Sequence, residues 1–127
     1  MKSPIYTRTA KIWLDEHGIC RFEAKSGERL ELSDAQEALQ AVLSLSDGNL
    51  PAILVDLRQL RAASKEAREY FSHEDNTRKI AALAFLVDSP LSTLLANFYI
   101  GLNPTGVPTK LFTTEEEAIQ WLKGHRS

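Results

Sequence analysis

The sequence predicts an α/β fold in which an N-terminal antiparallel hairpin is followed by repeated βα units, giving a mixed sheet. Apolar and polar residues alternate within the first 32 residues, as in half-exposed antiparallel strands. Two later runs, 52–57 and 81–87, are almost continuously apolar, which is typical of strands covered on both faces. Between these runs, apolar residues recur at helical spacing. The expected order is β-β-(β)-α-β-α-β-α-β-α, with right-handed crossovers and helices on the faces of the sheet.

The first elements are antiparallel strands. The segment 8–15 alternates, a turn follows at Glu16-His17-Gly18, and the alternation resumes over 20–24. A second turn leads into a short third strand that holds Leu30 and Leu32. We expect these strands to be half-exposed.

Each later helix is predicted by a residue that can cap its N-terminus. Ser33 stands three residues before Gln36, a capping-box spacing, and Asp47-Gly48-Asn49 ends the first helix. The caps expected for the following helices are Ser64, then Ser89 with Pro90 in the first helical position, then Thr113 or Thr114. A last strand is expected over 107–112, before the final helix.

Length and composition are those of one globular domain. The chain has 127 residues, of which 43% are hydrophobic and 25% charged, so a single core over residues 1–127 is expected. Residues 1–7 and 124–127 are predicted to be frayed. The lone Cys20 excludes an internal disulfide and fits a reducing cytosol, so the predicted location is cytoplasmic.

Charge and hydropathy exclude two classes of partner. A net charge of −2, with no basic stripe, argues against nucleic-acid binding. The longest mostly apolar stretches, 80–87 and 91–102, are too short to span a membrane. The N-terminus lacks the apolar run of a signal peptide.

No catalytic, metal or cofactor site can be assembled from the sequence. His73 and Glu74 are adjacent, and adjacent helical residues point about 100° apart, so they do not converge on one metal ion. An enzyme centred on Asp56, His73 and Glu74 is the catalytic alternative, and no substrate class suggests itself. We therefore expect a protein that is not an enzyme and needs no cofactor.

Two features remain as candidate sites. Asp56 ends an apolar strand and Ser64 opens the next helix. Local roles, with Asp56 bonding loop amides and Ser64 capping its helix, are one interpretation. A phosphorylation switch at Ser64 is the other, because a phosphate is favoured at a helix N-terminus.

The third helix is apolar around more of its circumference than a helix lying on a sheet needs. Its stripe, together with Tyr99 beside it, forms the predicted partner- or ligand-binding set: Leu91, Leu94, Leu95, Phe98, Tyr99 and Leu102. Packing within the core could absorb these side chains. A subunit interface or a groove for an apolar, lipid-like ligand is the alternative.

Several segments carry a resemblance to a known family. They are AILVDLRQL, ASKEAREYF, FLVDSPLSTLLANFYIGLN and PTKLFTTEEEAIQWL. The sequence resembles a small bacterial family of STAS-like domains of unknown function, related in fold to anti-anti-sigma factors and more distantly to CRAL-TRIO domains. The resemblance covers about residues 8–122. It implies a STAS-like fold and docking onto a protein partner.

The resemblance also implies a regulatory serine near Ser64, because anti-anti-sigma factors are phosphorylated at the start of the equivalent helix. This chain keeps Asp56-Leu57, but it lacks the Asp, the second Ser and the Gly that surround the family's phosphosite.

The sequence thus favours a non-enzymatic regulatory module that associates with a protein partner, most simply with itself as a homodimer, through the third helix. Two alternatives stay open. One is carriage of a small apolar ligand between the sheet and the third helix, and the other is a switch at Ser64.

Overall fold

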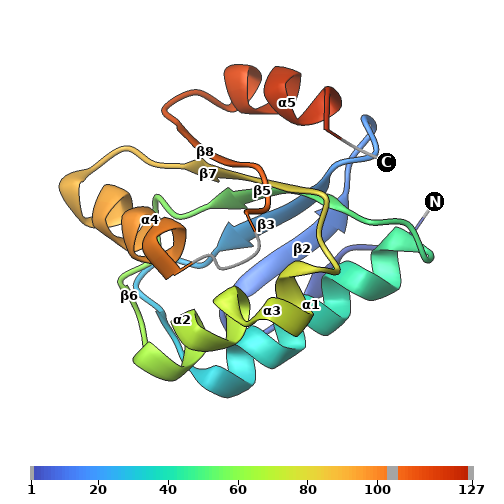
Figure 1. The fold of residues 1–127 in the computed structure, drawn as a ribbon. Helices are drawn as coiled ribbons and strands as arrows, with labels where there is room; N and C mark the ends of the chain where they lie inside the picture. The colour runs from blue at the N-terminus through green and yellow to red at the C-terminus, as the bar shows by residue number, and fades with distance from the viewer. Residues whose placement is uncertain (1, 103–105, 126–127) are drawn as a thin grey trace.

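The computed structural model describes residues 2–102 and 106–125. A six-stranded mixed sheet runs through its centre in the order β1-β2-β3-β5-β7-β8 (Figure 1). Its strands are β1 (Ile5–Tyr6), β2 (Ala10–Leu14), β3 (Cys20–Ala24), β5 (Ala52–Asp56), β7 (Ala82–Leu86) and β8 (Thr109–Phe112). The pairs β1–β2 and β2–β3 are antiparallel, and the pairs β3–β5, β5–β7 and β7–β8 are parallel. The predicted mixed α/β fold is confirmed.

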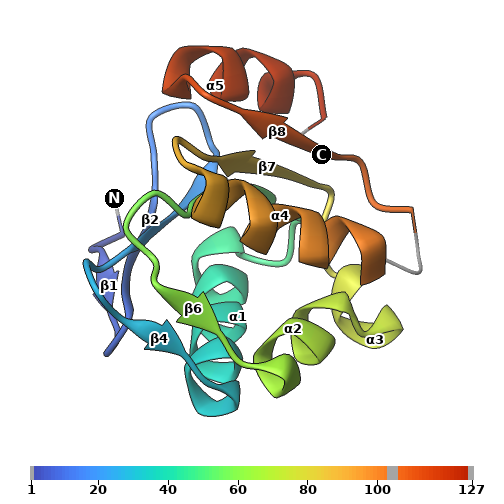
Figure 2. The same cartoon turned by 90° about the vertical axis from the view of Figure 1, so that its left-hand side faces the viewer.

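The helices lie on both faces of this sheet. They are α1 (Leu32–Ser46), α2 (Lys65–Ser72), the single-turn α3 (Glu74–Thr77), α4 (Pro90–Leu102) and α5 (Glu115–Lys123). Figures 1 and 2 show α1, α2 and α4 on one side of the sheet and α5 alone on the other. All crossovers between parallel strands therefore use the first side, and α5 closes the second.

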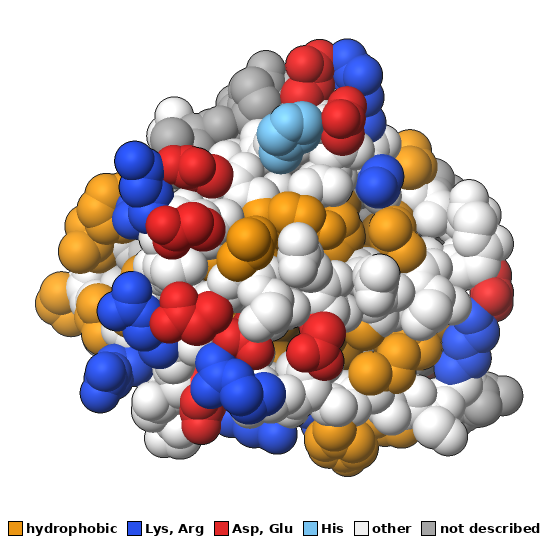
Figure 3. All heavy atoms as spheres, turned by 90° about the horizontal axis from the view of Figure 1, so that it is seen from below, with side chains coloured by type: hydrophobic (Ala, Val, Ile, Leu, Met, Phe, Trp, Pro, Cys, Tyr) orange, Lys and Arg blue, Asp and Glu red, His pale blue; other side chains and the backbone are white. Residues whose placement is uncertain are grey.

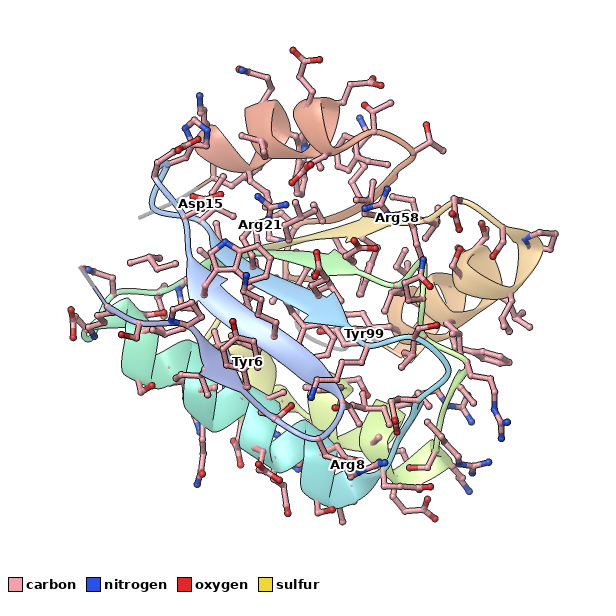
Figure 4. The ribbon with its side chains drawn as sticks, turned by 180° about the vertical axis from the view of Figure 1, so that it is seen from behind. Tyr6, Arg8, Asp15, Arg21, Arg58 and Tyr99 are labelled. Atoms are coloured by element: carbon pink, nitrogen blue, oxygen red, sulfur yellow. The ribbon has the colours of Figure 1, made fainter. Side chains whose placement is uncertain are left out.

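The predicted hairpin between β2 and β3 is confirmed, with Leu14 opposite Cys20. Gly18 takes the positive φ of 75° that the turn requires. The Asp15 carboxylate accepts the backbone N–H groups of His17 and Ile19 at 2.8 and 3.0 Å. Asp15 is thus a turn-forming residue, and Arg21 on β3 lies beside it (Figure 4).

The sheet separates two cores. The side chains facing α1, α2 and α4 include Ile12, Phe22, Ile53, Leu83 and Phe85. Those facing α5 include Ile19, Ala52, Leu54, Ala82, Ala84 and Leu86, and they pack on Ala118 and Leu122 of the helix. The period of two along each strand distributes alternate residues to the two cores.

Two described parts of the segments 1–7 and 124–127, which were predicted to be frayed, make defined contacts. Ile5 and Tyr6 pair with Ile12 and Lys11, so the N-terminal segment adds an edge strand to the sheet. At the other end, the ring of His125 packs on Trp121 at 4.4 Å between centroids. Residues 126–127 lie outside the described residues.

The first helix starts earlier than the cap predicted at Ser33. Glu31 is its N-cap, and Asp34, at the third helical position, accepts the Glu31 backbone N–H at 2.8 Å. Arg8, two residues before β2, binds the same Asp34 carboxylate, which holds that carboxylate in the capping position. Leu32, predicted to lie in a strand, is therefore helical. The expected caps Ser64, Ser89 and Thr114 are confirmed.

A second, two-stranded sheet was not predicted. The strands β4 (Arg29–Leu30) and β6 (Ala62–Ala63) run parallel and pair with each other. This ladder ties the segment before α1 to the segment before α2. It therefore fixes where α2 starts over the first face of the main sheet.

Candidate functional site

Helix α4 packs on the sheet through a narrow stripe of mostly small side chains. Ser92, Ala96 and Tyr99 are 1%, 0% and 7% exposed. The Tyr99 ring meets Phe85 of β7 edge-on at 5.4 Å between centroids, and its hydroxyl donates to the Phe71 carbonyl oxygen at 3.3 Å. Burial raises the pKa of Tyr99 to about 12. Tyr99 therefore joins α4 to both β7 and α2.

The opposite side of α4 presents large apolar side chains to the exterior. Leu91, Leu94 and Phe98 are 45%, 51% and 44% exposed, and their spacing of three and four residues places them on one stripe. Residues 90–102 contain no charged side chain. The core therefore does not absorb this apolar surface.

The six side chains predicted to bind a partner or ligand thus divide into two groups. Leu91, Leu94 and Phe98 form the exposed stripe of α4, whereas Tyr99 is buried and Leu95 packs partly against the core. The side chain of Leu102 lies outside the described part of the structure.

An apolar cavity lies between the first face of the sheet and the helices that cover it. Its volume is about 100 Å³. An engineered cavity of about 150 Å³ is enough to bind benzene, so this space suits a group of similar or smaller size. Strand residues Phe22, Ile53, Val55, Leu83 and Phe85 form one wall, and Ala38, Val42, Phe71, Leu95 and Tyr99 from α1, α2 and α4 form the other.

Arg68 of α2 is the charged residue in the wall of this cavity. Its guanidinium lies 4.5 Å from the centre of the Phe98 ring, a cation–π arrangement. Its Nε atom is buried and has no hydrogen-bond partner among the described residues. Arg68 and Phe98 also line a shallow outer hollow between α2 and α4, together with Lys65, Glu69, Asn97 and Gly101. Arg68 therefore borders both the cavity and the exterior.

Arg68 did not emerge from the sequence as a site residue. It follows Ala67 directly, and Ala67, Tyr70 and Phe71 recur at the spacing of a helical stripe that faces a core. An arginine at the edge of such a stripe is ordinarily a solvated residue with a buried stem. The sequence gives no sign that a cavity lies beneath it.

Asp56 and Ser64 have the local roles that formed one of the two predicted alternatives. The Asp56 carboxylate accepts the Arg58 backbone N–H at 3.0 Å and binds its guanidinium at 3.0 and 2.8 Å. Ser64 is 4% exposed, and its hydroxyl accepts the Ala67 N–H at 3.1 Å. A kinase could reach Ser64 only if the first turn of α2 opened. The switch at Ser64 stays a prediction.

The residues of the catalytic alternative are engaged separately. His73 Nδ1 accepts the Asp75 N–H at 3.2 Å and so caps α3, Glu74 pairs with Arg78, and Asp56 pairs with Arg58. Burial raises the pKa of the Cys20 thiol to about 12, which keeps it protonated and unreactive. Within the described ranges, no three His, Cys, Asp or Glu residues are placed to hold a metal ion.

The face of the molecule that carries α1, α2 and α3 shows no preference for one sign of charge. Seen from the side of α1, α2 and α3, acidic and basic side chains are intermixed (Figure 3). On the far side of the sheet, the Trp13 ring makes cation–π contacts with two basic side chains. The Lys11 ammonium lies 4.7 Å and the Arg21 guanidinium 5.3 Å from the ring centroid. No helix among the described residues is long and apolar enough to cross a membrane.

The sheet order and the placement of its helices define a small α/β module with a SpoIIAA-like, or STAS-like, fold. The structure is similar to that of an uncharacterized protein of the DUF3478 family from Shewanella loihica PV-4, described as having a SpoIIAA-like fold. The TM-score is 0.65 over 96% of this chain and 98% of that one, with 18% identity, so the likeness concerns the fold. The predicted resemblance to STAS-like domains is confirmed.

The chain belongs to the family described as "Domain of unknown function (DUF7793)", whose model matches residues 12–126. A protein of unknown function from Arthrobacter sp. FB24 shows 28% identity over 95% of this chain and 98% of that one, but its TM-score of 0.33 supports no structural argument. No protein of curated function matches the sequence.

Proposed function

We propose that this protein is a non-catalytic module that associates with a second copy of itself through the exposed stripe of α4. The observation that carries the proposal is the continuous stripe of Leu91, Leu94 and Phe98, each between 44% and 51% exposed. Single exposed leucines are ordinary on protein surfaces, but a continuous stripe of large side chains on one helix face is a feature of interfaces.

A second copy of the chain is the partner that fits this surface best. In a two-fold dimer the same patch occurs on both subunits, so any charge near the axis faces its own equivalent. Residues 90–102 carry no charge, so the α4 helices themselves can face each other without repulsion, and the nearest charge described on the stripe is that of Arg68 at its Phe98 end. Phe98 supplies the large aromatic side chain that tends to dominate binding at the centre of an interface.

Light scattering coupled to size exclusion tests the association. We expect the wild-type protein to elute as a dimer and Leu94→Glu to elute as a monomer with an unchanged circular dichroism spectrum, because a charge in an apolar interface would be buried without a partner. Leu50→Glu is the matched control, since Leu50 is 47% exposed but lies beyond the end of α1. A wild-type monomer at high concentration, or a Leu94→Glu dimer, would contradict the proposal.

A second candidate function is carriage of a small apolar ligand, and the cavity beneath α2 and α4 favours it. A cavity lined by Leu, Ile and Phe side chains stays dry and binds small apolar molecules. Hexan-1-ol should therefore raise the melting temperature, because a ligand that binds only the folded state stabilises it. The variant Ala38→Leu, which adds three carbons at the cavity wall, should abolish that rise. No rise in the wild-type protein, together with an empty protein in native mass spectrometry, would contradict this function.

A further inference from the structure

The buried Nε donor of Arg68 destabilises the folded protein unless a ligand supplies a hydrogen-bond acceptor for it. A guanidinium carries five N–H donors in a planar fork and no acceptor. A buried donor without a partner destabilises the folded protein, and it does so more when the group is charged. The Arg68 Nε is such a donor among the described residues, held beside the Phe98 ring.

No described side chain accepts a hydrogen bond from this Nε atom. The other residues that line the cavity have hydrocarbon side chains apart from Tyr99, whose hydroxyl is already bonded to the Phe71 carbonyl oxygen. In the outer hollow, Glu69 lies near Lys65 at 3.7 Å. The charges of Lys65 and Glu69 offset each other, so Arg68 leaves one net positive charge at this position.

These features define the chemistry of a ligand. Its anionic group must carry a single charge and accept parallel N–H donors, which matches a carboxylate facing a guanidinium. The rest of the molecule must be apolar and small, because the cavity holds about 100 Å³. Building on the ligand-carrying function above, we propose that the protein binds a small organic acid, with its carboxylate on Arg68 and an apolar body of roughly four to six carbons in the cavity.

The comparison of hexanoate with hexan-1-ol at neutral pH tests the role of Arg68, because the two probes share one hydrocarbon chain. Hydrogen bonds to charged groups are stronger than neutral ones, so we expect hexanoate to bind the wild-type protein about tenfold or more tightly than hexan-1-ol does by isothermal titration calorimetry. Hexanoate, and not hexan-1-ol, should also shift the Nε–Hε signal of Arg68 in ¹⁵N nuclear magnetic resonance spectra. A purely structural arginine would not produce that difference.

Two variants complete the experiment. Arg68→Met keeps an apolar stem of similar length and should abolish the preference for hexanoate while leaving hexan-1-ol binding within a few-fold. Arg78→Met removes one positive charge from an exposed residue near α3 and should keep the full preference. If Arg68→Met fails to fold, the wild-type probe comparison and the Arg68 signal still decide the question.

The outcomes separate this inference from the function on which it rests. Equal binding of hexanoate and hexan-1-ol to the wild-type protein would overturn the role of Arg68 and leave a purely apolar carrier. Binding of neither probe would overturn both. A preference that persists in Arg68→Met would show that another cation holds the carboxylate, and it would also overturn the assignment.

Discussion

The two faces of the main sheet come from the same strands but are filled differently. On the face toward α5, Leu54, Ala84 and Leu86 are fully buried against Ala118 and Leu122, all with 0% exposure. On the other face, Ile53, Leu83 and Phe85 are also buried, yet they line a cavity. Burial from solvent is therefore not the same as close packing. The two faces differ in how completely the helix side chains fill the space above the strands.

The side chains on the strands explain part of this difference. Alanines at positions 52, 82 and 84 face α5, so a single helix carrying Ala118 and Leu122 covers that face closely. The opposite face carries larger residues such as Phe22 and Phe85, over which three helices must share the cover. The side chains of these three helices do not fill all the space above the bulky strand residues. The remaining cavity is bordered by Arg68 and Tyr99.

Adding side-chain volume to each face sharpens this comparison. We expect its effect on stability to be larger than that of the pH-dependent ion pair described below. Ala84→Leu, on the α5 face, should lower the free energy of unfolding by about 1–3 kcal/mol, because extra carbons in a filled core force neighbouring side chains apart. Ala38→Leu, on the cavity face, should leave stability unchanged or raise it by about 0.5–2 kcal/mol, as cavity-filling substitutions do. Urea unfolding of both variants measures the difference. Equal losses at the two positions would show that the two faces are packed alike.

The sequence predicted most of the fold because each main element carries its own local signal. Alternation marked the hairpin, continuous apolar runs marked β5 and β7, and Ser64 and Ser89 marked helix starts. The strands β1 and β6 were missed, and the short strand predicted around Leu30 was extended wrongly to Leu32, because two-residue strands have no period to detect. They form only where the rest of the fold brings two segments together.

The candidate site was less accessible to prediction. A helix that is apolar nearly all round does not reveal which side faces the sheet, and the polar Ser92 turned out to be buried. Its hydroxyl is held inside because it accepts the backbone N–H groups of Asp88 and Ser89 at 3.0 and 3.1 Å. That local capping helps to turn Leu91 and Leu94 outward. The cavity and the role of Arg68 depend on the spacing of three helices, which no local pattern encodes.

On the cavity face, the attachment of α1 makes a smaller contribution to folding stability, and this contribution depends on pH. Asp34 is 3% exposed, and Arg8, labelled in Figure 4 at the start of α1, hydrogen-bonds its carboxylate. These hydrogen bonds hold the pKa of Asp34 below its ordinary value, against the opposing effect of burial. Because the folded-state pKa is lowered, the carboxylate contributes stability above its unfolded pKa of about 3.9. That contribution is lost as the pH falls through the folded value.

Unfolding in urea between pH 6 and pH 2 tests this contribution. Asp34→Asn should be less stable than the wild-type protein at pH 6, and the gap should close progressively below about pH 4, where the wild-type carboxylate becomes protonated. Glu116→Gln, on the exposed first turn of α5, is the matched control and should follow the wild-type curve throughout. A gap between Asp34→Asn and the wild-type protein that stays constant down to pH 2 would contradict an ionic role. It would leave Asp34 as a cap whose charge does not contribute to the attachment of α1 on the cavity face.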